Sequence, residues 1–290
     1  MNTVCIAIML LTAISTLPVY GEAGASFPFF AFCIDTHDSE NRALDEQAAL
    51  LKELGYDGVG HLWLDDVKER LESLDAVGLK LFQITMRVDI TAEEEAYDQR
   101  LKDVLPLLKG REVQLCLLMG GMSPSDTAGD ARAAVIVNEI AGLARESDTQ
   151  ILLYPHANDW LERVEDAVRL AEKVNLPNVG VMFNLCHWLK VDEEENMVPL
   201  LEKAMPRLWA VSINGADNAD AIRDGDGDWL QPLDSGAFDV FSLVNALKTL
   251  GYKGPIGLQC WGIEGDARDH LTRSMRAWDA IQQRLEEKHE

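Results

Sequence analysis

The stretch LGYDG at residues 54–58 decides the fold, because it recurs almost unchanged as LGYKG at residues 250–254. Each copy follows a run with helical periodicity and precedes a short apolar run. Each therefore predicts a helix that ends at a glycine and leads into a new strand. The two copies mark the entries to the second and the last strand of a repeating strand-and-helix pattern.

Short apolar runs alternate with longer amphipathic runs from Phe27 onward, as in strand–helix units on a parallel sheet. Eight units within about 260 residues are typical of a closed barrel. A Rossmann-type open sheet is the rival, but no G-x-G-x-x-G follows the first run. No Pro/Ser-rich linker divides the chain. We therefore predict an α/β protein with a single-domain (β/α)8 TIM barrel. The predicted strands are 27–33, 57–61, 79–85, 113–119, 150–155, 179–184, 208–214 and 255–260.

The runs between these strands have the 3.6-residue period of helices that bury one face. After the first strand, the residues that share a face are Leu44, Ala48, Leu51 and Leu54. After the third strand they are Leu101, Leu105 and Leu108. Thr91 with Glu94 predicts a capping box at the start of that third helix.

Residues 1–25 have the composition of an export signal. The run 4–17 is uncharged and mostly apolar, and Ala23-Gly24-Ala25 fits the A-x-A pattern at which such signals are cleaved. Residues 1–4 lack the basic side chains with which export signals normally begin, so an uncleaved anchor or a misassigned start codon is the alternative. We predict an export signal at 1–25, a mature barrel at 26–290, and a secreted or periplasmic location.

The chain is strongly acidic, with 49 Asp and Glu residues against 26 Lys and Arg residues and a net charge of −23. Such a charge repels nucleic acid and anionic lipid. No internal stretch is long and apolar enough to cross a bilayer. We therefore expect no nucleic acid partner, and no membrane partner for the mature form. The four cysteines after the signal form no C-x-x-C pair, and we expect buried thiols at Cys33, Cys116, Cys186 and Cys260.

Histidines stand at the positions where barrels carry their chemistry, the carboxyl ends of the strands. Neutral imidazole can accept or donate a proton near pH 7 and can bind metals, so histidines on one rim predict a proton-transfer or metal site. Hydrogen bonds within loops are the alternative for any single one of them. The four at predicted strand ends are His37, His61, His156 and His187. We expect His270 and His289, in the last helix and tail, to be solvated.

Amide side chains also occupy the mouths of apolar strands, at Asn184, Asn214 and Gln259. A buried amide is costly unless it is bonded, and each amide offers the donor and the acceptor that sugar hydroxyls need. Tryptophans can supply apolar faces for a sugar ring, although packing is the alternative. The candidates are Trp63, Trp188 and Trp261. Arg87 is the main exception to a scarcity of basic residues at strand ends, so a neutral sugar is favoured over a phosphorylated one.

The sequence resembles the xylose isomerase-like TIM barrels, the sugar phosphate isomerase and epimerase superfamily, over essentially all of 26–290. The motifs are LKELGYDGVG, LLYPH, NVGVMFNLCH, VSINGAD and GYKGPIGLQ. The resemblance implies, for metal-dependent members, a divalent cation held by Glu, Asp, His and Glu at the ends of strands five to eight. This chain has Tyr154, Asn184, Ser212 (or Asn214) and Gln259 there.

Neutral side chains hold Mg²⁺ or Mn²⁺ weakly, so we expect no metal site at these positions and no cofactor. A different site, in which His61, His156 and His187 join an acidic loop residue, is the alternative, and a divalent metal (Mn, Zn or Mg) would then be present.

We predict a sugar or keto-sugar isomerase or epimerase that transfers a proton next to a carbonyl of a small-molecule carbohydrate. His156 would be the principal acid or base and His187 its partner. The predicted substrate-binding residues are His61, Asn184, Asn214, Gln259 and Trp261. One alternative is a 3-keto-glycoside lyase that uses the same acid–base residues, and another is a non-catalytic carbohydrate-binding barrel.

Overall fold

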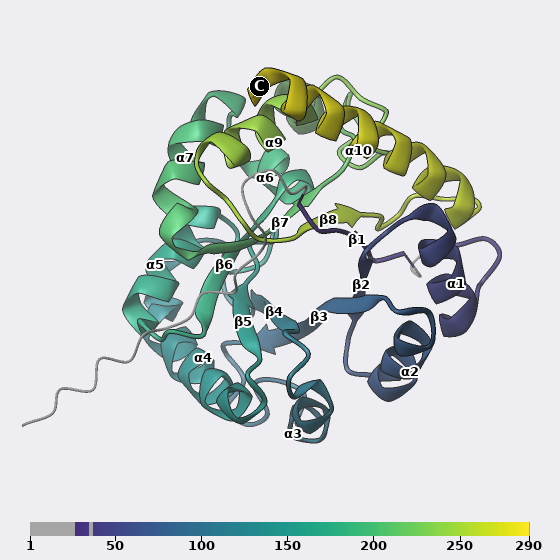
Figure 1. The fold of residues 1–290 in the computed structure, drawn as a ribbon. Coiled ribbons are helices and arrows are strands. Elements are labelled where there is room, and N and C mark those ends of the chain that lie inside the picture. Colours follow the sequence, from purple (N-terminus) through teal and green to yellow (C-terminus); the bar gives the residue numbers. More distant parts are fainter. Residues whose placement is uncertain (1–26, 35–36, 290) are drawn as a thin grey trace, which may run out of the picture.

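The computed structural model describes residues 27–34 and 37–289. Eight parallel strands form a barrel that closes in chain order, and the helices surround it (Figure 1). The prediction of a (β/α)8 barrel is confirmed. The predicted export signal at 1–25 lies outside the described residues. Within those residues, no helix has the length and apolar character needed to span a membrane.

The eight strands agree with the predicted runs to within a few residues. They are β1 (Phe29–Phe32), β2 (Gly58–Leu62), β3 (Lys80–Asp89), β4 (Gln114–Gly120), β5 (Gln150–Leu153), β6 (Val179–Asn184), β7 (Leu208–Ile213) and β8 (Ile256–Gln259). The helices are α1 (Leu44–Leu54), α2 (Val67–Val77), α3 (Leu101–Val104), α4 (Asp130–Ala144), α5 (Val164–Val174), α6 (Leu185–Val191), α7 (Met197–Ala204), α8 (Ala219–Asp224), α9 (Val240–Thr249) and α10 (Ala267–His289). Short 3₁₀ turns are η1 (Leu105–Leu108), η2 (Thr127–Gly129), η3 (Arg145–Ser147), η4 (Glu194–Asn196) and η5 (Met205–Arg207).

The LGYDG and LGYKG repeats end helices as predicted. Gly55 has a φ of +87° directly after α1, and Gly251 has a φ of +81° just after α9. A left-handed residue at this position lets the chain leave the helix and turn back toward the barrel. Tyr56 and Tyr252 then lie buried at the entries to β2 and β8.

The centre of the barrel is filled by aromatic side chains of β1. Phe30 and Phe32 point inward, and the neighbouring strands accommodate them with glycines. A Cβ at Gly60 would lie 2.5 Å from the Phe32 ring, and one at Gly257 would lie 2.7 Å from the Phe30 ring. These close approaches explain why two strands of a packed barrel carry glycine at inward positions.

Three glutamines close the amino-terminal end of the barrel. Gln83 Nε2 donates to Gln114 Oε1 at 3.2 Å, and Gln114 Nε2 donates to Gln150 Oε1 at 3.2 Å. Gln114 Nε2 also lies 3.3 Å from the carbonyl oxygen of Trp209, on β7. This end of the barrel is therefore polar and largely bonded to itself, although Gln83 Oε1 has no partner among the described residues.

The third helix differs from its prediction at its start. The predicted buried face is correct, because Leu101, Leu105 and Leu108 are all buried. The predicted capping box is wrong, because α3 begins only at Leu101. The backbone N–H and the hydroxyl of Thr91 both donate to Asp89 Oδ1, at 2.8 and 2.7 Å. The threonine thus closes a turn at the end of β3 instead of capping a helix.

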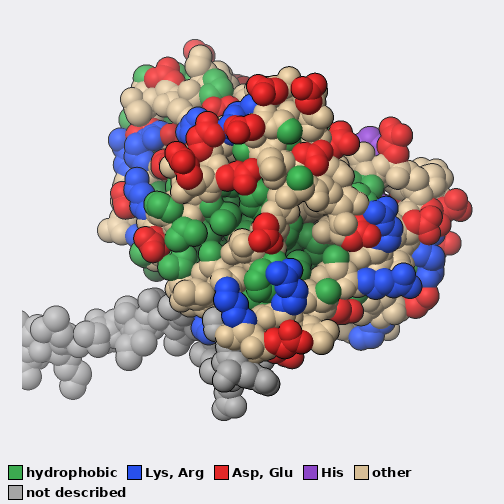
Figure 2. All heavy atoms as spheres, turned by 90° about the horizontal axis from the view of Figure 1, so that it is seen from above, with side chains coloured by type: hydrophobic (Ala, Val, Ile, Leu, Met, Phe, Trp, Pro, Cys, Tyr) green, Lys and Arg blue, Asp and Glu red, His purple; other side chains and the backbone are tan. Residues whose placement is uncertain are grey.

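Buried and exposed side chains follow the predictions with one exception. The thiols of Cys33, Cys116, Cys186 and Cys260 are buried and form no disulfide, as expected. His270 is buried on the inner face of α10, so the prediction that it is solvated is wrong. Burial lowers the pKa of His270 to about 4. The acidic excess lies at the surface, where Asp and Glu side chains are widely spread over the face shown in Figure 2.

Candidate active site

A cavity of about 230 Å³ opens at the carboxyl ends of the strands. Pockets for drug-sized ligands measure roughly 300–1,000 Å³, so this cavity suits a smaller molecule such as a monosaccharide. Apolar side chains form its floor, and polar and aromatic groups surround them. The lining residues are Phe32, Cys33, Leu62, Trp63, Thr85, Arg87, Leu118, Tyr154, His156, Ala157, Asn158, His187, Lys190, Trp229, Leu230, Gln259 and Trp261.

His156 and His187 lie against each other in the wall of this cavity. Their ring centroids are 3.9 Å apart and their planes are inclined by 42°. Burial lowers the pKa of both imidazoles, and a charge on one ring opposes a charge on the other. Both rings are therefore neutral at neutral pH, and the pair holds at most one proton readily.

The surroundings of His156 fix which nitrogen is free. Its Nδ1 lies 3.1 Å from the carbonyl oxygen of Ala157 and 3.4 Å from Asp159 Oδ2. Both neighbours can only accept, so Nδ1 carries the proton and Nε2 presents a lone pair. Asp159 favours the protonated ring, although burial and the nearby charges of Arg87 and Lys190 outweigh it. His156 can therefore accept a proton at Nε2 and has a carboxylate beside it that stabilises the resulting charge.

Tyr154, directly after β5, presents a phenol that can serve a ligand only as a hydrogen-bond donor. Its oxygen accepts hydrogen bonds from Asn184 Nδ2 at 2.6 Å and from Gln259 Nε2 at 3.4 Å. Both amide orientations are fixed, because their oxygens accept the backbone N–H groups of His187 at 3.4 Å and Trp261 at 3.1 Å. With its lone pairs occupied, the phenol retains one proton to donate, and Tyr154 lines the cavity. Burial also raises the pKa of Tyr154 well above its usual value, so the phenol keeps this proton.

Two of the predicted substrate-binding residues, Asn184 and Asn214, do not line the cavity but support side chains and loops that do. Asn184 is buried, holds Tyr154 and caps α6 through its bond to the His187 N–H. Asn214 is also buried, and its Nδ2 donates to the carbonyl oxygens of Gly215 at 2.8 Å and Trp229 at 3.1 Å. The Asn214 amide nitrogen thus bonds to the main chain and supports the loop that carries Trp229, whereas its Oδ1 is buried without a partner among the described residues, so its contact with a ligand stays a prediction.

His61 does not reach the cavity. Alternate residues of a strand face opposite sides, and Gly60 faces the barrel interior, so His61 faces the helices. Its Nε2 lies 2.7 Å from the carbonyl oxygen of Asp65, and Arg70 Nε, on α2, donates to its Nδ1 at 3.3 Å. His61 is therefore not among the residues that line the cavity, unlike His156 and His187.

The tryptophans divide between the cavity and the core. Trp63 and Trp261 line the cavity, as does Trp229. Trp188 is buried outside the barrel, where it packs against Phe183 with ring centroids 5.6 Å apart. Trp261 is 43% exposed and lies at the mouth, so it is free to contact a ligand that enters.

The residues at the family's metal-ligand positions do not fit a divalent cation. The oxygens of Asn184 and Gln259 accept backbone N–H groups, and burial disfavours a phenolate at Tyr154. Ser212 and Asn214 add no charge. A hard cation needs oxygen ligands with negative charge to offset its dehydration. In the described part of the chain, moreover, no three or more His, Cys, Asp or Glu side chains gather as a metal site would require.

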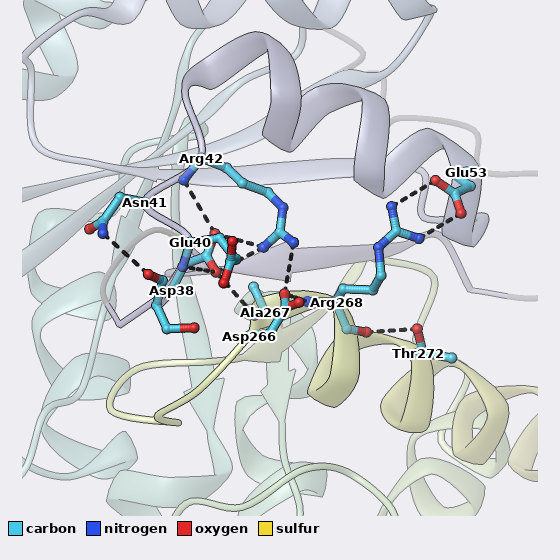
Figure 3. A network of polar contacts seen from close by, with 10 residues as sticks. Asp38, Glu40, Asn41, Arg42, Glu53, Asp266, Ala267, Arg268 and Thr272 are labelled. Atoms are coloured by element: carbon cyan, nitrogen blue, oxygen red, sulfur yellow. Dashed lines mark hydrogen bonds and ion pairs between the residues drawn. The ribbon is translucent and has the colours of Figure 1, made fainter.

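An ion-pair network holds one side of the rim (Figure 3). Asp38, in the loop after β1, accepts Arg42 Nη1 at 2.8 Å and the Ala267 N–H, at the start of α10, at 3.1 Å. Arg42 Nη2 pairs with Asp266 at 2.8 Å. Burial would raise the pKa of Asp38, but these bonds hold it below its usual value. The network ties the loop after β1 to the loop after β8, which carries Trp261.

An outer groove of about 530 Å³ lies next to the cavity. It shares Trp63 and Arg87 with the cavity, so the two spaces are neighbours. Its other charged groups are mostly acidic. The remaining lining residues are Leu64, Asp65, Met86, Asp89, Glu95, Ala96, Tyr97, Asp98 and Arg100.

The profile of the xylose isomerase-like TIM barrels matches residues 48–281, so the chain belongs to this family. The fold is similar to D-allulose 3-epimerase from Methylomonas sp. in complex with D-allulose (TM-score 0.70, 19% identity, 90% of this chain and 100% of that one). It is similar to an L-ribulose 3-epimerase (TM-score 0.71, 13% identity, 90% of this chain and 96% of that one). It is also similar to 3-keto-D-glucoside 4-epimerase from E. coli (TM-score 0.67, 15% identity, 89% of this chain and 100% of that one). No curated protein sequence matches significantly.

The sequence reasoning missed several side chains that shape the site. Tyr154 was visible only as a departure from the family's ligand pattern. Lys190 lies three residues after His187, and Asp159 lies three residues after His156. Within a helix this spacing puts two side chains on one face, which could have pointed to Lys190. Asp159 and Trp229 lie in loops, where spacing gives no such signal.

Proposed function

We propose that the protein is a sugar or keto-sugar isomerase or epimerase that transfers a proton next to a carbonyl without a metal. The observation that carries this proposal is the contact between His156 and His187 beside the phenol of Tyr154, in a cavity of monosaccharide size. The fold that the family shares with sugar epimerases supports the substrate class.

The proposed reaction begins when Nε2 of His156 removes a proton from the carbon next to the carbonyl. Negative charge then develops on the carbonyl oxygen, and the Tyr154 hydroxyl donates a hydrogen bond to it. Asn184 and Gln259 hold the phenol and so need no rearrangement as the charge develops. Asp159 stabilises the imidazolium. The enediolate oxygen then takes up a proton while the neighbouring hydroxyl gives one up, and return of the imidazolium proton to the former carbonyl carbon completes an isomerisation.

The contact of the two imidazoles favours isomerisation over epimerisation. Ring centroids 3.9 Å apart leave no space for a substrate carbon between His156 and His187. The two bases of a two-base epimerase must face opposite sides of one carbon, whereas an isomerase can move a proton along a single face. We therefore propose His187 as the partner that modulates the basicity of His156, with both acting from one side.

The test is solvent deuterium incorporation by the purified protein on a panel of aldoses, ketoses and 3-keto-sugars. Deuterium should enter at the carbon next to the carbonyl. His156→Gln should lower the rate by about 10²–10⁴-fold while sugar binding persists. Lys203→Gln, at an exposed side chain on α7 outside the cavity lining, is the control and should keep full activity. Full activity of His156→Gln would remove the role given to that residue.

Metal-free chemistry has its own test. Elemental analysis of protein purified without chelators should find less than one equivalent of Mn, Zn or Mg, and activity should survive dialysis against a chelator. One bound equivalent that is lost together with activity contradicts this part of the proposal.

The outer groove favours a second candidate, the 3-keto-glycoside lyase. A glycoside has two parts, and the groove provides a second space that shares Trp63 and Arg87 with the cavity. Elimination also begins with proton abstraction next to a carbonyl, so His156 would serve both reactions. Release of the aglycone from a 3-keto-glycoside, with no isomerised sugar formed, would favour this candidate over the isomerase.

A further inference from the structure

The charged residues of the cavity are of one sign. Among the described residues that line it, Arg87 and Lys190 are charged, and none is Asp or Glu. This pattern is the reverse of the whole chain, whose net charge is −23. It is also the reverse of the adjoining outer groove, which is mostly acidic. A cavity that concentrates positive charge in an acidic protein favours a ligand of negative charge.

Lys190 is the stronger of the two indications. It is half-buried on α6, and no ion pair joins it to a carboxylate of the described residues. Its Nζ lies instead 3.1 Å from the ring centroid of Trp229, and burial lowers its pKa. An ammonium that loses water without gaining a carboxylate is costly, and a bound anion would offset that cost.

Arg87 adds a second, weaker positive charge at the mouth of the cavity. Its side chain is exposed, with its guanidinium 5.6 Å from the ring centroid of Trp63 and 3.7 Å from Asp159. Asp159 neutralises part of its charge, so the cavity offers about one full positive charge in its wall and a partial one at its mouth. Among the other lining groups, Trp63, Trp229 and Trp261 provide apolar faces for the rest of a sugar.

We propose that the substrate is a sugar acid, whose carboxylate binds Lys190 in the cavity wall with Arg87 at the mouth. This inference rests on the proposed function and specifies its substrate. A carboxylate fits better than a phosphate. Phosphate sites combine several N–H donors, often from a bidentate arginine or the main chain, whereas this cavity offers one ammonium and an arginine that Asp159 already neutralises in part.

A bound carboxylate would also strengthen the base. Arg87 and Lys190 both contribute to the lowered pKa of His156. A carboxylate bound at Lys190 offsets part of this positive charge, so the imidazole becomes a better proton acceptor when the substrate is present. A neutral sugar gives no such gain, so the preference for a sugar acid should be seen in turnover as well as in binding.

The experiment is a titration of tryptophan fluorescence in the full-length protein with sugars that differ in one group. The probes are hexuronates such as D-glucuronate and D-galacturonate, the matching neutral hexoses, and the hexose 6-phosphates. At least one hexuronate should bind 10-fold or more tightly than its neutral hexose, and high salt should reduce the difference. Lys190→Met should weaken hexuronate binding by about 10–100-fold and leave hexose binding nearly unchanged.

Lys203→Met, at an exposed lysine on α7, is the matched control and should bind like the unaltered protein. Lys190→Arg should retain part of the preference, which separates lost charge from misfolding. Equal binding of acid and neutral sugars, a preference for the 6-phosphates, or no binding of any hexuronate overturns the inference. Deuterium incorporation into neutral sugars without acid preference would leave the proposed function standing, whereas hexuronate binding without any incorporation would remove the proposed function alone.

Discussion

Buried amides occupy both ends of this barrel, and they do different things. At the amino-terminal end, Gln83, Gln114 and Gln150 bond to one another and to the main chain. At the carboxyl end, Asn184 and Gln259 both donate to the Tyr154 phenol. Both sets satisfy most of their buried polar groups, as folded proteins require, although Gln83 Oε1 has no partner among the described residues. The difference is that the second set leaves one donor, the phenol proton, on a residue that lines a cavity.

This difference shows that a buried amide in a barrel strand is weak evidence of a site. The better evidence is the group to which its hydrogen bonds lead. A chain of amides that ends on a backbone carbonyl stabilises the fold, whereas amides that converge on a hydroxyl with an unused proton prepare a donor for catalysis. Substitution at the carboxyl end should therefore lower turnover, whereas substitution at the amino-terminal end should lower stability alone.

The largest expected effect is on turnover, from Tyr154→Phe. Removing the phenol proton should lower kcat by about 10²–10³-fold, the range found when one donor to a developing oxyanion is lost. The free energy of unfolding should also fall, by about 1–3 kcal/mol, because the buried amide donors of Asn184 and Gln259 lose their acceptor. Steady-state kinetics and urea unfolding measure the two quantities.

Tyr56→Phe is the matched control for that substitution. Tyr56 is equally buried, its hydroxyl donates to the Leu271 carbonyl at 2.9 Å, and neither residue lines the cavity. It should lose about 1–2 kcal/mol of stability and keep its kcat. Similar kcat values for Tyr154→Phe and Tyr56→Phe would show that the phenol of Tyr154 is only structural.

Substitution at the other end of the barrel should lower stability alone. Gln114→Leu removes the link between Gln83 and Gln150 and leaves their polar groups without partners, at a cost of about 3 kcal/mol in the free energy of unfolding. The kcat of the folded fraction should be unchanged. A loss of kcat without a loss of stability would contradict the division between the two ends.

The smallest expected effect is on the acid sensitivity of the fold, through His270. Its pKa is about 4 in the folded chain and about 6.5 when unfolded, so between these values the unfolded state binds more protons. Its contribution to stability is therefore present above about pH 6.5 and is lost as the pH falls. His270→Leu should reduce the stability difference between pH 7 and pH 5 by about 2 kcal/mol. An unchanged difference in chemical unfolding would place the acid sensitivity at the other buried histidines.

The sequence predicted the barrel well because its signals are local. Glycines after α1 and α9, and apolar runs at regular intervals, follow from the geometry of each unit alone. The sequence also predicted that His156 and His187 lie on one rim, because the carboxyl ends of parallel strands meet there. The face of a strand is harder to predict. His61 stands at a strand end like the other two, but a shift of one residue points it toward the helices.

The remaining differences come from bonds that sequence spacing does not encode. Asn214 turns to the main chain of Trp229 because the loop after β7 returns to it, and no local pattern shows that return. Lys190 escaped notice because α6 begins directly after β6, so a residue that the sequence places inside a helix still lines the cavity.

The rim network has a consequence for how the chain is completed. The Asp38 carboxylate, near the beginning of the barrel, accepts the N–H of Ala267. Its partner Arg42 also pairs with Asp266, so both contacts depend on the last part of the chain. β1 also pairs with β8, so the first strand lacks one of its two neighbours until the last strand is made. A growing chain therefore lacks a finished rim until its final helix is made. Truncation before residue 266 keeps the pairing of β1 with β8 but removes Asp266 and Ala267, so the rim should be left open where Trp261 borders the cavity.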